Sequence, residues 1–172
     1  MARKFRGSEE VKVDAKGRVS IPAKFRRVFE SADPEWETGK RPQLVVVFGT
    51  ESWKHLQLFT MQAIDEVDEQ ISRLQRGSAA RNLLENIYHG HAEEAEIDGD
   101  GRLVLPQKLR EKIGLTDSAF FIASGDYLKV WSPENYREEE RELEARVPEF
   151  EPGADPLSLL ALASSQTITE AG

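Results

Sequence analysis

A short stretch near the start of the chain, Asp14-Ala-Lys-Gly-Arg18, combines residue types that can hold and present positive charge. An aspartate and an arginine four residues apart can pair across a tight turn, and Gly17 supplies the backbone freedom that such a turn needs. Arginine binds phosphate or the O6/N7 edge of guanine with two hydrogen bonds, and lysine offers phosphate a point charge. The stretch is therefore a candidate anion-binding turn.

Two interpretations of this turn stay open at the level of the sequence. The pair of Asp14 and Arg18 either only staples the turn, or it also presents a free guanidinium edge to a ligand. A carboxylate close to phosphate is repelled by it, so we expect Asp14 to be structural. Lys16 has no such structural duty and is the stronger candidate for contact with an anion.

A similar motif recurs 84 residues further on, as Asp98-Gly-Asp-Gly-Arg102. The segments 13–29 and 97–113 align without a gap. Their identical residues fall at turn and charged positions: Asp14/Asp98, Gly17/Gly101, Arg18/Arg102, Pro22/Pro106, Lys24/Lys108 and Arg26/Arg110. Apolar positions exchange one apolar residue for another, which is typical of two copies of one fold unit with repacked cores.

Each copy predicts the same order of elements. A strand ends near the aspartate, a turn and a short alternating strand follow, and a proline then opens a helix. Two further strands form a hairpin, "LVVVF" with "LQLFT" in the first copy and "AFFIA" with "LKVWS" in the second. Thr60 and Ser132 are expected to cap the helices that come next. The first copy also contains an insertion, "ADPEWETGKRPQ", which is rich in turn-forming residues and predicts an exposed loop.

One copy is about 48 residues long, which is small for an independent core. We therefore expect the two copies to share one pseudo-symmetric, β-rich α+β domain flanked by helices. The expected divisions are a first repeat at 8–55, connecting helices at 56–91, a second repeat at 92–135, a charged helix at 136–151 and a mostly disordered tail at 152–172.

Positive charge is concentrated at the start of the chain. The net charge is −8, yet residues 1–29 carry +6 and the remainder carries −14. Such asymmetry is typical of a local anion-binding face on an otherwise repelling body, although a solvated basic terminus would look the same. The two turns also differ, because residues 14–18 sum to +1 and residues 98–102 to −1.

The doubled motif resembles the SpoVT/AbrB class of swapped-hairpin DNA-binding modules. Two such modules in one chain resemble the MraZ family of bacterial transcriptional regulators, as do "FRG" at 5–7, "NIYHGHAEEAEID" before the second motif and "YLKVWSPENY" after it. The resemblance covers roughly residues 4–140. It implies an AbrB-like barrel whose two halves come from one chain.

The resemblance also implies a function. Members assemble into rings, bind short direct repeats in promoter DNA through the turn that carries the motif, and commonly repress the division and cell-wall gene cluster. Double-stranded DNA and further copies of the chain are thus the expected partners, with a cytoplasmic, nucleoid-associated location. The residues predicted to contact DNA are Lys16, Arg18, Lys24, Arg27, Arg3, Lys4 and Arg6. Those predicted to shape the two turns are Asp14, Gly17, Asp98, Gly101 and Arg102.

The lower charge of the second repeat indicates that it acts mainly as scaffold, because phosphate contacts dominate affinity for DNA. A different class of function stays open, namely an antitoxin-like or structural interaction protein of the same fold. Antitoxins of this fold usually have one module and a long tail, whereas this chain has two modules and a short tail.

Other functions find little support in the sequence. Cysteine is absent, which excludes disulfides and thiolate metal sites, and no glycine-rich phosphate loop or catalytic triad motif occurs. His89 and His91 lie near several glutamates, but nothing completes a metal site, so we expect no metal, no cofactor and no enzymatic activity. The longest apolar run, 157–163, is too short to span a bilayer.

Overall fold

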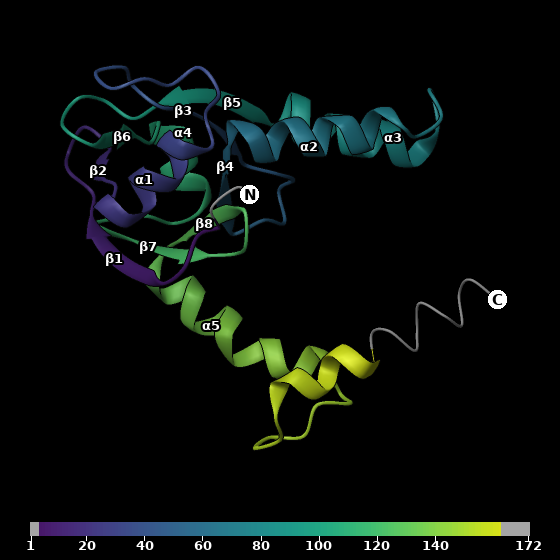
Figure 1. Ribbon diagram of the computed structural model, residues 1–172. Helices are drawn as coiled ribbons and strands as arrows, with labels where there is room; N and C mark the ends of the chain where they lie inside the picture. The colour runs from purple at the N-terminus through teal and green to yellow at the C-terminus, as the bar shows by residue number, and fades with distance from the viewer. Residues whose placement is uncertain (1–3, 163–172) are drawn as a thin grey trace. The chain divides into compact units, whose positions relative to one another are not determined.

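The computed structural model describes residues 4–162 (Figure 1). Both repeats belong to one compact unit that ends at Asn135, and a second unit begins at Tyr136. In the first unit a six-stranded antiparallel sheet, a two-stranded ribbon and short helices form a mixed α/β structure. The predicted β-rich fold built from two internal repeats is confirmed.

The two repeats have the same elements in the same order. The first contains β1 (Ser8–Lys12), β2 (Arg18–Ser20), α1 (Ala23–Ser31), β3 (Gln43–Val47) and β4 (His55–Thr60). The second contains β5 (Ala92–Glu96), β6 (Arg102–Val104), α4 (Gln107–Lys112), β7 (Ser118–Ala123) and β8 (Tyr127–Trp131). Between them lie α2 (Met61–Ser72), α3 (Ala79–Glu85) and a π-helical turn (Asn86–Gly90).

Local chemistry explains where the helices begin. Pro22 and Pro106 each occupy the position just before a helix, where a missing N–H costs no hydrogen bond. The hydroxyl of Thr60 accepts a hydrogen bond from the backbone N–H of Ala63 at 3.1 Å, and the hydroxyl of Ser132 accepts one from Asn135 at 3.1 Å. The two predicted caps are therefore present.

The strands of the sheet are exchanged between the repeats. The order is β1-β7-β8-β4-β3-β5, so the first strand of each repeat pairs with the hairpin of the other. Ser8–Lys12 run antiparallel to Ser118–Ile122, and Ala92–Glu96 pair in the same way with Gln43–Val47. Neither repeat can complete its share of the sheet alone.

A pseudo-twofold axis relates the two repeats. In the centre of the sheet Gln57 lies opposite Lys129, its equivalent in the second repeat. In the separate ribbon Val19 lies opposite Leu103, which is again its equivalent. Both pairs are positions where the axis must pass, so the ribbon of β2 and β6 lies on the same axis as the sheet.

The main core lies between the sheet, the ribbon and helices α1 and α4. Its largest fully buried side chains include Phe25, Phe29 and Phe121, together with the ribbon residues Val19 and Leu103. Burial of this apolar surface is the dominant favourable contribution to folding. Both repeats supply the core, as expected for one shared domain.

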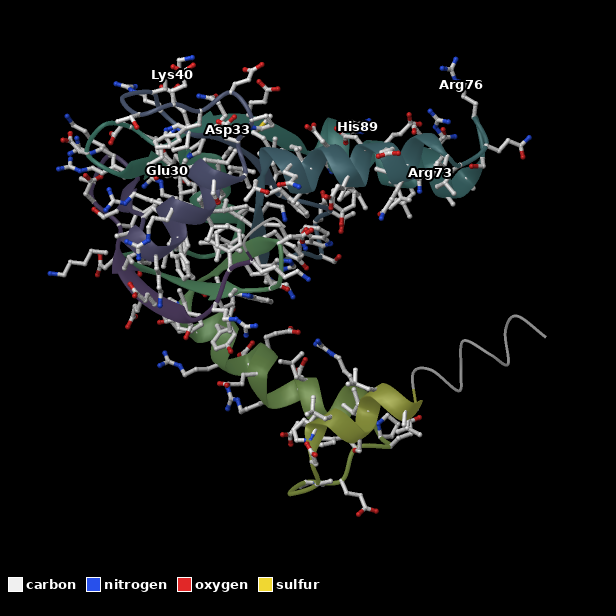
Figure 2. The ribbon with its side chains drawn as sticks, in the orientation of Figure 1. Glu30, Asp33, Lys40, Arg73, Arg76 and His89 are labelled. Carbon is white, nitrogen blue, oxygen red and sulfur yellow. The ribbon has the colours of Figure 1, made fainter. Side chains whose placement is uncertain are left out.

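The opposite face of β3 and β4 is covered by α2. Val45, Val47 and Phe59 pack there against Ala63 and Ile64. Because β3 is buried on both faces, its sequence is a continuous apolar run instead of an alternating one. Helices α2 and α3 lie side by side and form an arm, with Arg73 and Arg76 at its outer end (Figures 1 and 2). Within the described residues no helix has the length and apolar character needed to cross a membrane.

The insertion between α1 and β3 forms a loop that includes Asp33 and Lys40 (Figure 2). The buried carboxylate of Asp33 accepts hydrogen bonds from the backbone N–H groups of Glu35 at 3.0 Å and Gln43 at 2.9 Å. The indole of Trp36 donates to the carbonyl of Lys40 at 2.8 Å. The loop is exposed, as predicted, and these bonds close it.

The second unit is helical where it is described. Helix α5 (Pro133–Leu143) begins with the last three residues of the first unit and continues in the second. A 3-10 turn follows at Glu144–Arg146, and Arg146 forms ion pairs with Glu139 and Glu142. A further 3-10 turn occupies Pro156–Ser158. Residues 163–172, nearly half of the tail predicted to be disordered, lie outside the described residues.

Two neighbouring residues of β6 test the placement of the core. Leu103 is 1% exposed and Val104 is 53% exposed. We expect Leu103→Ala to lower the free energy of unfolding by about 2–5 kcal/mol, because it opens a cavity on the pseudo-twofold axis. Val104→Ala should change it by no more than about 0.5 kcal/mol. Chemical denaturation at one fixed protein concentration measures both, and equal losses would contradict this core.

Candidate nucleic-acid interface

The turn at residues 14–18 is closed by the side chain of Asp14. Its Oδ1 accepts hydrogen bonds from the backbone N–H groups of Lys16 and Arg18, both at 2.9 Å, and its Oδ2 accepts one from Arg18 Nε at 2.6 Å. The Gly17 N–H donates to the carbonyl of Asp14 at 2.9 Å. The aspartate therefore shapes the turn from within, and the Lys16 side chain is left exposed at its tip.

The second turn repeats most of this geometry. Asp98 Oδ1 accepts from the backbone N–H groups of Asp100 at 2.9 Å and Arg102 at 3.0 Å. In the part of the chain that the structure describes, however, the Arg102 side chain makes no hydrogen bond to Asp98. The two turns thus share a backbone shape but differ in charge, because Asp100 occupies the place of Lys16.

Both turn aspartates are held in their charged form. Hydrogen bonds from the backbone N–H of Arg18, and then from its side chain, lower the pKa of Asp14 below its ordinary value of 3.8. The backbone N–H of Arg102 does the same for the pKa of Asp98. A charged acceptor makes the stronger hydrogen bonds, so each turn is most rigid when its aspartate is ionised.

The ribbon of β2 and β6 presents side chains of both repeats on one outer face. Val19 and Leu103 point into the core, so their neighbours along each strand point outward. In the antiparallel register Arg18 lies opposite Val104, and Ser20 lies opposite Arg102. A two-stranded β-ribbon is one of the elements that fit the major groove of DNA.

A shallow groove of about 530 Å³ runs beside this face. Its walls include three cations and two carboxylates from both repeats: Lys12, Arg18, Arg102, Asp14 and Asp117. The Nε of Arg18 donates to Asp14, which orients the guanidinium and offsets part of its charge, while its terminal nitrogens make no hydrogen bond to Asp14. The arrangement offers several cations to a polyanion along one surface.

Two predicted contact residues lie on α1. Arg27 is exposed there. Lys24 is also exposed, but its Nζ forms an ion pair with Glu9 at 3.3 Å and lies 5.1 Å from the centre of the Phe25 ring. The carboxylate of Glu9 offsets part of the charge that Lys24 would offer to DNA, which the sequence pattern did not indicate.

The basic residues before β1 lie beside the turn between β7 and β8. Lys4 and Arg6 are exposed, while Phe5 between them is buried against Phe25 and Phe29 of α1. The backbone N–H of Phe5 donates to the carbonyl of Gly125 at 2.8 Å. Arg3, the remaining predicted contact, lies outside the described residues. The structure therefore places Arg18 beside Arg102 at the groove and Lys16 at the tip of the adjoining turn, while Lys4 and Arg6 lie at a different hairpin.

The two histidines considered as metal ligands have separate partners. His89 Nε2 lies 3.0 Å from Asp68 Oδ1, and His91 Nδ1 lies 2.9 Å from the carbonyl of Gly49. His91 also stacks on the ring of Phe48. Among residues 4–162 no group of three or more side chains is arranged to hold a metal ion.

The pattern of a known family covers nearly the whole of this structure. The family described as "MraZ protein, putative antitoxin-like" matches residues 4–85 and 89–156. The chain belongs to the MraZ family. The two matched segments correspond to the two repeats and the helices that follow them, so the resemblance seen in the sequence is confirmed.

Named relatives agree with this membership. A protein of Ruegeria sp. (strain TM1040), named transcriptional regulator MraZ, is 51% identical over 161 residues, which cover 93% of this chain and 96% of the relative. A protein of the same name from Ruegeria pomeroyi is 54% identical and covers 81% and 84% of the two chains. One from Cereibacter sphaeroides (strain ATCC 17025) is 41% identical over 93% and 97%. The chain is accordingly a member of a family of transcriptional regulators and not an enzyme.

The sequence pattern did not indicate every residue of this surface. Lys12, Ser20 and Val104 were not singled out, and Arg102 was assigned only to the shape of its turn. Alternation along "RVSI" and "RLVL" did indicate that Arg18, Ser20, Arg102 and Val104 face away from the core. The missing information was the pairing of β2 with β6, which makes the two outer faces one.

The turn glycine supplies one test. A methyl group on Gly17 would lie 2.4 Å from the carbonyl oxygen of Leu105, and the backbone φ there is +82°. Gly39 has a similar φ of +94° with nothing within 4 Å. Gly39→Ala should cost about 1–2 kcal/mol from backbone strain alone. Gly17→Ala should cost about 1–3 kcal/mol more because of the clash, and thermal or chemical unfolding that ranks the two equally would refute this close approach.

The turn aspartates also predict a pH dependence. A carboxyl whose pKa is lowered on folding stabilises the native state above its unfolded pKa, and that contribution disappears as the pH falls through the lower, folded pKa. We expect the wild type to lose stability progressively between about pH 5 and pH 2. The Asp14→Asn variant should lose less over the same interval. Unfolding curves at several pH values measure both. If the free energy of unfolding changed equally with pH in the two proteins, an ionised Asp14 would not be stabilising the turn.

Proposed function

We propose that this chain is a transcriptional regulator that binds double-stranded promoter DNA through the turn at residues 14–18 and the outer face of the β2–β6 ribbon. The observation that carries the proposal is the groove beside the ribbon, where Lys12 and Arg18 of the first repeat meet Arg102 of the second, with Lys16 exposed at the tip of the adjoining turn. Arginine is suited to bidentate contact with phosphate or guanine, and a β-ribbon can enter the major groove. The regulatory role of the family supports the same conclusion.

The first repeat supplies most of the affinity in this proposal. Its turn carries Lys16 where the second carries Asp100, and its helix carries Arg27 where the second carries Glu111. Each phosphate contact releases counterions and so adds to the affinity for DNA. The repeat with more exposed cations therefore contributes most of that affinity. Lys24, Lys4, Arg6 and Arg3 are proposed as additional contacts, with Lys24 weakened by Glu9.

We further propose that several copies act together as a ring. One chain offers only a small basic face, and a ring brings several such faces to successive direct repeats in one promoter, which raises the effective affinity. Repression of the division and cell-wall gene cluster, and a nucleoid-associated location, belong to the same proposal. They rest on the family likeness and not on a contact in this chain.

An interaction protein is the second candidate. The described part of the tail carries Leu157 and Leu160, which are 69% and 65% exposed and offer apolar surface to a protein partner. The printed family description includes the word "antitoxin-like". A chain with no affinity for its own upstream DNA, even at low salt, would favour this candidate.

A DNA-binding measurement with a matched control tests the proposal. The double variant Lys16→Ala/Arg18→Ala should bind the DNA upstream of the gene far more weakly than the wild type. The slope of log affinity against log salt should become shallower by about 2, because two phosphate contacts are lost. Fluorescence anisotropy over a range of salt concentrations measures both quantities.

The control removes the same charge elsewhere. Arg73 and Arg76 lie at the outer end of the α2–α3 arm (Figure 2), and Arg73→Ala/Arg76→Ala should leave affinity and salt slope nearly unchanged. Size-exclusion chromatography should show the same assembly for all three proteins. Equal losses of affinity in the two double variants would overturn the assignment of the face.

A further inference from the structure

Each turn is held by the backbone of the other repeat. The N–H of Leu105, just after β6, donates to the carbonyl of Gly17 at 2.8 Å. The N–H of Ile21, just after β2, donates in the same way to the carbonyl of Gly101 at 2.8 Å. The shape of each turn therefore depends on residues about 85 positions away in the chain.

An arginine side chain of the opposite repeat also packs against each turn glycine. A methyl group on Gly17 would lie 2.8 Å from Arg110 Nε, and one on Gly101 would lie 2.5 Å from Arg26 Nη1. A Cβ at either glycine would displace the guanidinium from its place. Arg26 and Arg110 are equivalent residues of α1 and α4, so the first helix supports the second turn and the second helix supports the first turn.

The two arginines are not equally well anchored. Arg110 Nε donates to the carbonyl of Leu105 at 2.9 Å, and Leu105 is the residue whose N–H holds Gly17. Arg26 Nε is buried and has no hydrogen-bond partner within residues 4–162. The better-anchored arginine lies against the turn with net charge +1, and the less anchored one against the turn with net charge −1.

We infer that Arg110 is a positioning residue for DNA binding: from the second repeat, it holds Leu105 and Gly17 so that the turn bearing Lys16 and Arg18 keeps its shape. This inference rests on the proposed function for its effect on DNA. It gives the second repeat a definite part in recognition, although its own turn is acidic. Lysine cannot replace Arg110, because an ammonium lacks the planar group that fills the space beside Gly17 while Nε donates to Leu105.

Hydrogen exchange of the free protein tests the positioning directly. Arg110→Lys keeps the charge and should speed amide exchange in a peptide covering residues 14–18 by about threefold or more, with little change at 98–102. Arg26→Lys is the matched variant and should act on 98–102 instead. Mass spectrometry of the intact assembly reads both peptides in one experiment. Exchange that is unchanged in both turns, or changed in the variant's own repeat, would overturn the inference.

A double-mutant cycle on DNA affinity tests the consequence. Arg110→Lys should weaken binding roughly three- to tenfold, and Lys16→Ala should lose much of its own effect in that background, because the two residues act through one turn. The effect of Arg27→Ala on α1 should remain the same in both backgrounds. Additive effects of Arg110→Lys and Lys16→Ala would show that Arg110 does not act through the turn.

The two measurements separate the possible failures. If the wild type binds no DNA, the proposed function fails, while hydrogen exchange still decides whether Arg110 holds the first turn. If DNA binds and the crossed exchange pattern is missing, the proposed function survives and the positioning role does not. Circular dichroism melting of each variant shows whether the loss of binding reflects unfolding, and near-wild-type melting is expected for Arg110→Lys.

Discussion

The exchange of strands between the repeats is the constraint on which this structure depends. Because β1 pairs with β7 and β5 pairs with β3, each hairpin of the sheet gains its third strand only from the other repeat. The same crossing brings β2 beside β6, places Val19 against Leu103 in the core, and leaves Arg18 and Arg102 on one outer face. A surface that combines both repeats is thus a result of the topology and not of any single motif.

In both repeats the aspartate of the motif fixes the conformation of its turn. Its carboxylate collects backbone N–H groups of the turn, and in the first repeat it also directs a guanidinium. An acidic residue in a turn proposed to face DNA looks contradictory when charge alone is considered. The contradiction disappears because the carboxylate accepts hydrogen bonds from backbone N–H groups of its own turn, which would otherwise need water.

Much of the local structure could be predicted from the sequence, because it depends on neighbouring residues. Gly17 and Gly101 predicted tight turns, Pro22 and Pro106 predicted helix starts, and Thr60 predicted a cap; all five are found in the structure. The likeness of the two copies also predicted a shared core. These inferences need only periodicity, turn chemistry and the repeat itself.

Long-range pairing was beyond the reach of that reasoning. Nothing in "RVSI" states that it lies against "RLVL", and nothing near Lys24 states that Glu9 is its partner. Arg26 and Arg110 occupy equivalent positions in the two copies, but only the fold shows each of them against the glycine of the other copy. Register between distant strands, unlike turn type, is decided by the packing of the whole domain.

The exchanged first strand has a consequence for the making of the protein. Ser8–Lys12 finds its partner at Ser118–Ile122, so a chain emerging from the ribosome must extend through β7 before β1 can pair. Contacts so distant in sequence are expected to form late and to slow folding. Until then both edges of β1 are unpaired, and its charged residues Glu9, Glu10 and Lys12 discourage it from pairing with another nascent chain.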